Sequence, residues 1–214
     1  MNNFKFTHNW FGQTNHIDAF IEPLNREKEL HILEIGSFEG RGTTYFASKL
    51  LDHPKSTITC IDPWTSYTQD ENSFNSYHKS KEKHKLNNPI PTWDFTTHKA
   101  TWEHNINESG FKQQIKPIQG FSHEILPTLL TDNKKYDLIF VDGNHASAFV
   151  LTDAVMSFYL IKTGGIIIFD DYHWRPNYQE TFTPKLGVDS FINSFKDYLE
   201  VLDGGSRKAV IKIK

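Results

Sequence analysis

The chain has 214 residues, a length that suits one α/β domain with a well-filled core. Hydrophobic residues make up 37% of the sequence and aromatic residues 14%, which argues against a disordered chain. The net charge is −3 and the basic residues are scattered, whereas a nucleic-acid groove needs a concentrated basic face.

The single cysteine, Cys60, excludes an intrachain disulfide and lies in an apolar run. We therefore expect a buried thiol and a reducing, cytoplasmic setting. The first residues lack the apolar core of a signal peptide, and no run approaches the ~20 apolar residues of a membrane span. We predict no nucleic-acid and no membrane partner. The number of subunits stays open, with a homo-oligomer among the states that the sequence allows.

The amino-terminal residues 1–13 are polar and aromatic with no clear period, and the sequence does not decide between a flexible arm and a lid. A short helix is expected from Asn15 to just before Pro23.

A glycine-rich turn, residues 36–42, follows the first predicted strand, Leu30–Ile35, and leads into a helix that ends near Pro54. This order is typical of a nucleotide-cofactor site, because glycines let the backbone approach a ligand and the helix N-terminus is electropositive. The spacing G-x-x-x-G-x-G differs from the G-x-G-x-x-G of dinucleotide sites, which disfavours a pyrophosphate. Glu34, two residues before the first glycine, favours a cationic ligand. The alternative is a tight turn that binds nothing.

The second predicted strand, Thr57–Ile61, ends on Asp62. An acid at this strand tip usually accepts hydrogen bonds from ribose hydroxyls, and the alternative is a helix cap or a solvated side chain. Residues 65–95 then form a long polar stretch with weak periodicity, which is typical of a functional lid or a disordered loop. We expect an insertion that covers the functional site at the carboxyl ends of the strands and brings aromatic residues to the substrate. The alternative is a surface loop without a role. The aromatic candidates are Tyr67, Tyr77 and Trp93.

The rest of the chain alternates between predicted helices and strands, with no repeat and no second domain. Buried strands joined by a helix indicate parallel βαβ units, and the last hairpin closes the sheet antiparallel. We predict one domain over residues 1–214 with a lid-like insertion at about 65–95. The further elements are a helix at Thr96–Gly110, a strand at Ile115–Gln119, a helix at 123–130, a strand at Asp137–Val141, a helix across 148–159, a strand at Gly164–Phe169, a helix at Gly187–Tyr198 and a hairpin of Leu199–Leu202 with Lys208–Ile213.

Three acidic residues follow two of these strands: Asp142 after Asp137–Val141, and Asp170 and Asp171 after Gly164–Phe169. Parallel strands bring their carboxyl ends to one edge, where three carboxylates repel one another unless a cation lies between them. Carboxylate oxygens are the ligands that Mg²⁺ prefers.

His145 lies just beyond the first acid and is a candidate general base, because imidazole titrates near working pH. Three alternatives stay open: Asp142 caps the next helix, the Asp170–Asp171 pair is a solvated strand end, and His145 is a structural hydrogen-bonding group. Several other histidines show no tight zinc spacing, namely His78, His84, His98, His104 and His123.

Five segments carry a resemblance: EIGSFEGRGT, IDPW, GFSHEILPTL, YDLIFVDGNH and GGIIIFDDY. In this order they resemble class I S-adenosylmethionine-dependent methyltransferases. The nearer likeness is to the metal-dependent small-molecule O-methyltransferases, which include macrolide sugar O-methyltransferases and cephalosporin-hydroxylase-like relatives. The resemblance covers roughly residues 30–64 and 96–214. It implies a Rossmann-like, doubly wound α/β fold with a seven-stranded, mostly parallel sheet and an antiparallel C-terminal hairpin strand.

The resemblance also implies roles for individual residues. For S-adenosyl-L-methionine, it places Glu34, Gly36, Ser37 and Gly40 at the methionine end, Asp62 at the ribose, Trp64 near the adenosine, Gly120, Phe121 and Ser122 at the adenine, and Asp142 beside the cofactor. Asp142, Asp170 and Asp171 match the ligands of a divalent metal, and His145 matches the general base. Catechol-type relatives often carry Asn where this chain has Asp171, which favours the sugar-methyltransferase branch.

We therefore expect an S-adenosylmethionine-dependent O-methyltransferase that acts on a hydroxyl of a small molecule, such as a sugar or a glycosylated metabolite. Mg²⁺ or another divalent cation would assist, and His145 would take the proton. The alternatives are a metal-independent methyltransferase and a non-catalytic S-adenosylmethionine-binding homologue.

Overall fold

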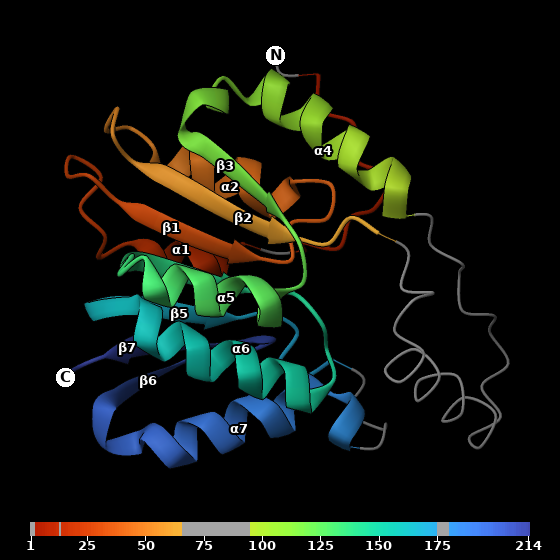
Figure 1. Cartoon of the computed structure of the whole chain (residues 1–214). Helices are drawn as coiled ribbons and strands as arrows, with labels where there is room; N and C mark the ends of the chain where they lie inside the picture. Colours follow the sequence, from red (N-terminus) through yellow and green to blue (C-terminus); the bar gives the residue numbers. More distant parts are fainter. Residues whose placement is uncertain (1–2, 13, 66–94, 175–179) are drawn as a thin grey trace, which may run out of the picture.

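The computed structural model describes residues 3–12, 14–65, 95–174 and 180–214. A seven-stranded sheet forms its middle layer, in the order β3-β2-β1-β4-β5-β7-β6 (Figure 1). The strands β1 to β5 are parallel, whereas β7 is antiparallel to both β5 and β6. This confirms the predicted fold class and the closing hairpin. The strands are β1 (His31–Ile35), β2 (Thr57–Asp62), β3 (Ile115–Gln119), β4 (Tyr136–Val141), β5 (Ile161–Phe169), β6 (Leu199–Gly204) and β7 (Arg207–Lys212).

Helices cover both faces of the sheet (Figure 1). One face carries α1 (Asn15–Ile21), α2 (Arg41–Leu50) and α4 (Phe95–Ser109), and the other carries α5 (Ser122–Thr131), α6 (Ser147–Leu160) and α7 (Pro184–Phe195). Short 3-10 helices are η2 (Lys112–Gln114), η3 (Glu180–Phe182) and η4 (Lys196–Tyr198). No helix in the described ranges is long and apolar enough to cross a membrane.

The apolar strands fill two separate cores. Because successive side chains of a strand point to opposite faces, a strand covered on both sides must be apolar throughout. Ile32 and Phe140 pack with α1, α2 and α4, whereas Leu33 and Ile139 pack with α5, α6 and α7. The unalternating runs that predicted buried strands therefore have this physical cause.

Some element bounds differ from the sequence-based expectation, and the sequence left the amino-terminal segment undecided. Helix α7 spans Pro184–Phe195 rather than Gly187–Tyr198. Strand β5 begins at Ile161 rather than Gly164, because Ile161 pairs with Tyr136 before a register shift in β4. Residues 3–12 pack against the domain: Asn105 of α4 accepts the Lys5 N–H at 2.7 Å and donates to the Lys5 carbonyl at 3.0 Å. The predicted insertion at 65–95 lies almost wholly outside the described residues.

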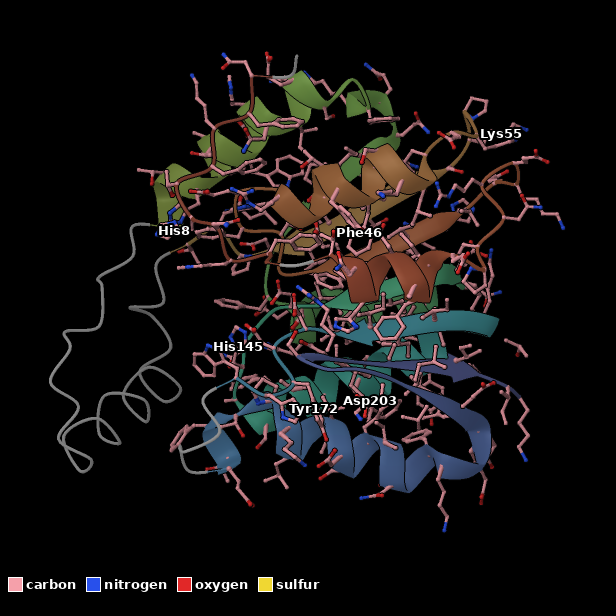
Figure 2. All side chains as sticks on the ribbon, turned by 180° about the vertical axis from the view of Figure 1, so that it is seen from behind. His8, Phe46, Lys55, His145, Tyr172 and Asp203 are labelled. Atoms are coloured by element: carbon pink, nitrogen blue, oxygen red, sulfur yellow. The ribbon has the colours of Figure 1, made fainter. Side chains whose placement is uncertain are left out.

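The carboxyl ends of the central strands are tied together by hydrogen bonds that continue past the strands. Gly36 donates its N–H to the Ile61 carbonyl at 2.8 Å, Asp142 to the Ile35 carbonyl at 2.8 Å, and Asp170 to the Val141 carbonyl at 3.0 Å. The glycine-rich turn and the tips of β4 and β5 therefore lie side by side. Figure 2 shows His145 at this edge of the molecule and Lys55 at the opposite edge.

Gly36 is required where this turn meets β4. Its φ is +87°, and a Cβ there would lie 2.0 Å from the Asp142 carbonyl oxygen. We predict that Gly36→Ala lowers the free energy of unfolding by about 3 kcal/mol or more, measured by urea denaturation. The control is Gly164→Ala, because Gly164 has a similar φ of +81° with nothing within 4 Å of its Cβ position. That variant should lose only about 1 kcal/mol, and equal losses would show that the contact with Asp142 is unimportant.

Candidate active site

The glycine-rich turn is held from below by Asp62 at the tip of β2. One carboxylate oxygen accepts the N–H groups of Ser37 at 2.9 Å and Phe38 at 2.8 Å, and the other accepts the Trp64 N–H at 2.8 Å. Asp62 is therefore neither a helix cap nor a merely solvated side chain. A carboxylate offers about four lone-pair sites, so these three bonds leave room for a further donor.

Glu34 lies beneath the same turn and is 1% exposed. It accepts hydrogen bonds from Ser37 Oγ at 2.6 Å and from the Thr43 hydroxyl. Burial raises the pKa of Glu34 from its ordinary 4.5 to about 7, although the bonds from Ser37 and Thr43 act in the opposite direction. A cation brought close to this carboxyl would favour its charged form.

The other predicted cofactor residues lie around the same end of the sheet. Gly40 caps α2 in a left-handed conformation, and a Cβ there would lie 2.9 Å from Trp102 Cδ1. Trp64 is 3% exposed and donates its indole N–H to the Phe38 carbonyl at 2.9 Å. The β3–α5 turn joins them, because Gly120 donates its N–H to the Asp62 carbonyl at 3.1 Å. The remaining two predicted adenine contacts, Phe121 and Ser122, cap and begin α5.

A second group of side chains lies beside the glycine-rich turn and consists of Asp142, His145 and Asp171. His145 Nε2 lies 2.9 Å from an Asp171 carboxylate oxygen and 3.8 Å from an Asp142 carboxylate oxygen, and one ligand atom from each side chain falls within 4.8 Å of the others. The His145 ring stacks on Trp174 with ring centroids 4.7 Å apart. Asp142 does not cap α6, because the N-cap residue is Ala146 and no side chain makes a capping hydrogen bond. The Ala146 N–H itself donates to Asn144 Oδ1 at 2.8 Å.

Asp170 lies deeper and is engaged by Arg207, a residue that the sequence analysis did not single out. Arg207 Nε lies 3.0 Å from one Asp170 oxygen and Nη2 donates to the other at 3.1 Å, and both side chains are buried. The same Nη2 donates to the Phe11 carbonyl at 2.7 Å. The pairing of Phe169 with Lys208 between β5 and β7 places Arg207 opposite Asp170, so only the register of β7 against β5 could have revealed this contact.

The carboxyl ends of β4 and β5 carry Asp142, Asp170 and Asp171, and we call this region the acidic edge. The balance of charges there favours a bound cation. Burial, then the carboxylates of Asp170 and Asp171, raise the pKa of Asp142, although 29% of its side chain is exposed. Arg207 compensates Asp170, which leaves Asp142 and Asp171 facing each other with His145 between them. Two carboxylates and an imidazole are a donor set that fits a divalent ion.

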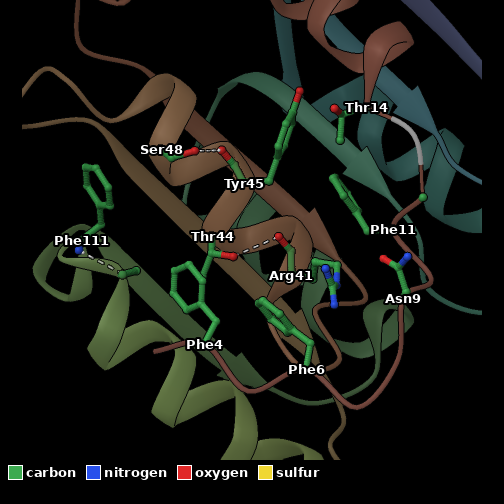
Figure 3. A pocket seen from close by; sticks show the side chains of 12 residues that line it. Phe4, Phe6, Asn9, Phe11, Thr14, Arg41, Thr44, Tyr45, Ser48 and Phe111 are labelled. Carbon is green, nitrogen blue, oxygen red and sulfur yellow. Dashed lines mark hydrogen bonds between the residues drawn. The ribbon is translucent and has the colours of Figure 1, made fainter. Parts of the chain in front are cut away.

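A cavity of about 330 Å³ lies elsewhere, between the amino-terminal segment and α2 (Figure 3). Five of its twelve lining residues are aromatic, and none is a carboxylate or a histidine. It therefore offers no carboxylate or imidazole ligand for a divalent cation, in contrast to the group of Asp142, His145 and Asp171. The lining residues are Phe4, Phe6, Asn9, Phe11, Gly12, Thr14, Arg41, Thr44, Tyr45, Ser48, Ser109 and Phe111.

Comparison with known proteins identifies the class. Residues 33–172 match the family model Methyltransf_24, described as a methyltransferase domain, so the chain belongs to this family. Together with the fold, this confirms the predicted enzyme class, an S-adenosylmethionine-dependent methyltransferase.

Individual relatives are distant. An uncharacterized protein of Acanthamoeba polyphaga mimivirus is 28% identical over 178 residues, covering 78% of this chain and 66% of the viral protein. The O-methyltransferase TomG from Streptomyces achromogenes, involved in tomaymycin synthesis and solved with S-adenosylmethionine, has a TM-score of 0.62 at 17% identity, covering 93% of this chain and 78% of TomG. MycE methyltransferase of the mycinamycin pathway, solved with Mg, SAH and mycinamycin VI, has a TM-score of 0.60 at 18% identity, covering 99% of this chain and 51% of MycE. The likeness to the two solved structures concerns the fold.

We predict that Arg207→Met lowers the free energy of unfolding by about 3–5 kcal/mol, because it leaves the buried Asp170 carboxylate without its partner. Denaturant unfolding at pH 7 measures this. Lys49→Met is the matched control, because the Lys49–Asp18 pair is 38% and 41% exposed and should contribute about 1 kcal/mol or less. Similar losses in both variants would contradict the assigned importance of the buried pair.

The raised pKa of Glu34 predicts a pH-dependent stability. The folded chain holds this proton up to about pH 7, whereas the unfolded chain releases it near 4.5. The stability gained from neutral Glu34 is thus complete below about pH 4.5 and is lost as pH rises through about 7. Relative to the unsubstituted protein, Glu34→Gln should gain roughly 2–3 kcal/mol between pH 5 and pH 8. Unfolding curves at both pH values test this, with the exposed Glu22→Gln as a control that should show no such gain.

Proposed function

We propose that the chain transfers the methyl group of S-adenosylmethionine to a hydroxyl of a small molecule, a sugar or a glycosylated metabolite, with a divalent cation, Mg²⁺ in the first instance, at the acidic edge. The convergence of Asp142, His145 and Asp171 beside the glycine-rich turn carries this proposal. Two enzymes of the same fold support it: TomG is an O-methyltransferase, and MycE is a methyltransferase.

The cofactor would lie over the turn between β1 and α2. Glu34, Gly36, Ser37 and Gly40 belong to the methionine end in this proposal, and Asp62 accepts the ribose hydroxyls with its remaining lone pairs. Trp64 packs near the adenosine, the β3–α5 turn of Gly120, Phe121 and Ser122 contacts the adenine, and Asp142 bounds the pocket on the β4 side. The positions of these residues at one end of the sheet support the assignment.

Asp142 and Asp171 are the proposed primary metal ligands. Asp170 stays a predicted ligand, but a cation would share its oxygens with Arg207. A bound cation would stabilise the substrate oxygen as it becomes anionic, which a hydroxyl needs in order to attack a sulfonium methyl group.

His145 is the proposed general base. Its Nε2 faces Asp171, so an Nε2–H donated to that carboxylate leaves Nδ1 as the nitrogen that accepts a proton. Asp171 would then orient the ring and stabilise the imidazolium, and the stacked Trp174 keeps it in place. The competing role is that Nε2 itself ligates the cation.

We predict that His145→Ala lowers kcat for methyl transfer by roughly 100-fold or more while the Kd for S-adenosylmethionine stays within a few-fold. Turnover on hydroxylated small molecules, with calorimetry for cofactor and Mg²⁺, measures both. An unchanged Mg²⁺ affinity supports the base, whereas a large loss of it shows that His145 is a ligand. His53→Ala, beyond the opposite end of the sheet, is the control.

The metal has its own test. Asp171→Asn removes a proposed metal ligand that is not among the proposed cofactor contacts, so it should abolish Mg²⁺-dependent turnover and leave cofactor binding largely intact. Full activity of the unsubstituted enzyme in chelator would favour the metal-independent alternative. Cofactor binding without turnover on any hydroxylated compound would favour a non-catalytic homologue, and absence of cofactor binding would overturn the proposal.

A further inference from the structure

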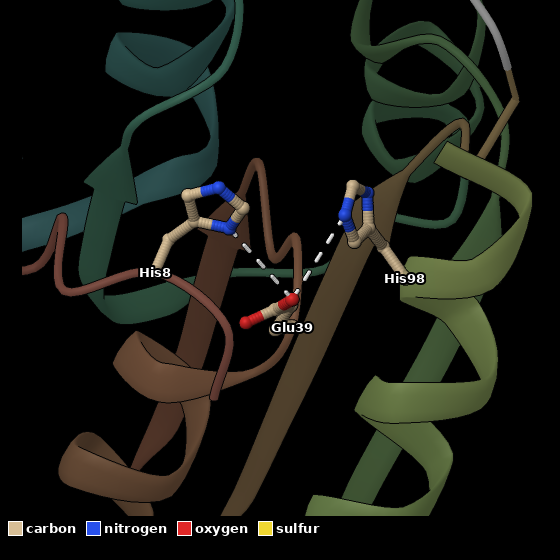
Figure 4. A group of neighbouring side chains, drawn as sticks. All are labelled: His8, Glu39 and His98. Atoms are coloured by element: carbon tan, nitrogen blue, oxygen red, sulfur yellow. Dashed lines mark ion pairs between the residues drawn. The ribbon is translucent and has the colours of Figure 1, made fainter. Parts of the chain in front are cut away.

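A second group of potential metal ligands lies at the amino-terminal segment, apart from the acidic edge (Figure 4). His8 comes from this segment, Glu39 from the glycine-rich turn and His98 from the first turn of α4. One ligand atom from each lies within 4.8 Å of the others. The two histidines are 90 positions apart in sequence, so no spacing rule could have joined them.

The carboxylate at the centre of this group is buried. Glu39 is 1% exposed and accepts hydrogen bonds from the Thr7 N–H at 2.8 Å and from the Thr7 hydroxyl. No lysine or arginine of the described residues forms an ion pair with it. A buried carboxylate is costly unless positive charge or further donors compensate it, and the two imidazoles lie within ion-pair distance and can bring such charge.

Both imidazoles point at the same Glu39 oxygen without bonding to it, as Figure 4 shows. His8 Nδ1 lies 4.0 Å and His98 Nε2 lies 3.9 Å from Oε1. These separations are too long for hydrogen bonds. Zinc bonds to nitrogen and oxygen are about 2.0–2.2 Å long, so two ligand atoms at a tetrahedral angle lie roughly 3.4 Å apart. An ion therefore needs each imidazole nitrogen to move about half an ångström closer to Oε1.

Aromatic contacts hold the two rings in place. Phe38, next to Glu39, lies 4.3 Å from the His98 ring and 5.7 Å from the His8 ring between centroids. Trp10 packs on His8 at 4.3 Å and stacks on Phe38 at 5.0 Å. A site whose ligand rings are already oriented loses little conformational entropy when an ion binds. His8 Nδ1 also lies 2.7 Å from the Thr7 hydroxyl, a contact that an ion would replace.

We propose that His8, Glu39 and His98 bind a divalent transition-metal ion of the Zn²⁺ type, with water or another donor completing the coordination. Two imidazoles and one carboxylate favour Zn²⁺ over Mg²⁺, whereas the acidic edge has the opposite preference. The ion would fasten residues 3–12 and α4 to the glycine-rich turn. Its role is therefore structural, and the proposal is independent of the reaction at the acidic edge.

The experiment measures Zn²⁺ binding by calorimetry in the full chain that carries Asp142→Asn and Asp171→Asn, so that the acidic edge cannot supply the signal. We expect one tight site, and we expect His8→Ala, His98→Ala or Glu39→Gln each to weaken it by roughly 10- to 100-fold or more. His53→Ala in the same background should bind as before. Co²⁺ as a second probe should give visible absorption bands that the His98→Ala variant loses.

Glu39→Gln keeps a hydrogen-bond acceptor and a donor beside Thr7, so this variant should still fold when it no longer binds the ion. Thermal unfolding of the variant in chelator checks that the fold is retained. Failure of the background protein to bind Zn²⁺ overturns the proposal. So does binding that survives in both His8→Ala and His98→Ala, because the ion would then lie elsewhere.

Discussion

The close approach of the glycine-rich turn to the tip of β4 is the constraint on which the site depends. Gly36 sits against the Asp142 backbone, with room for no side chain, while the Asp142 N–H bonds the Ile35 carbonyl. This contact therefore fixes the distance between the glycine-rich turn and the sheet. It also fixes the distance between Asp142 and that turn. In the proposed reaction, a methyl donor on the turn and a nucleophile beside Asp142 would meet only if both are fixed, because methyl transfer needs close alignment of the reacting atoms.

The carboxylates of the acidic edge differ in how their charge is compensated, because Asp170 is buried whereas Asp142 and Asp171 are partly exposed. Arg207 neutralises Asp170 inside the protein, and Asp142 and Asp171 are left to whatever binds above them. Burying a third uncompensated carboxylate would destabilise the fold further. The arginine thus lets the edge carry two available acids instead of three mutually repelling ones, and it explains why the aspartates of the DD pair occupy different environments.

The sequence allowed a good prediction of the fold and of which candidate residues meet at one edge of the sheet, and a poorer prediction of their contacts. Unbroken apolar runs such as Asp137–Val141 have one physical explanation, burial on both faces, and the ends of parallel strands share an edge. The bonds of Asp62 depend on the conformation of the glycine-rich turn, and the contact of Arg207 with Asp170 depends on the register of β7 against β5. Local sequence patterns encode neither. His8 and His98 meet at Glu39 only because α4 packs on α2 beneath the amino-terminal segment, and no spacing in the sequence announces that.

Arg207 also has a bearing on the order of assembly. It opens β7, which follows every other strand along the chain, and it bonds the Phe11 carbonyl as well as Asp170. During synthesis the acids of β4 and β5 therefore emerge without their counterion, and the amino-terminal segment has no anchor at this point. Docking of the hairpin supplies both together, so the acidic edge is complete only once the last strand of the chain has paired with β5.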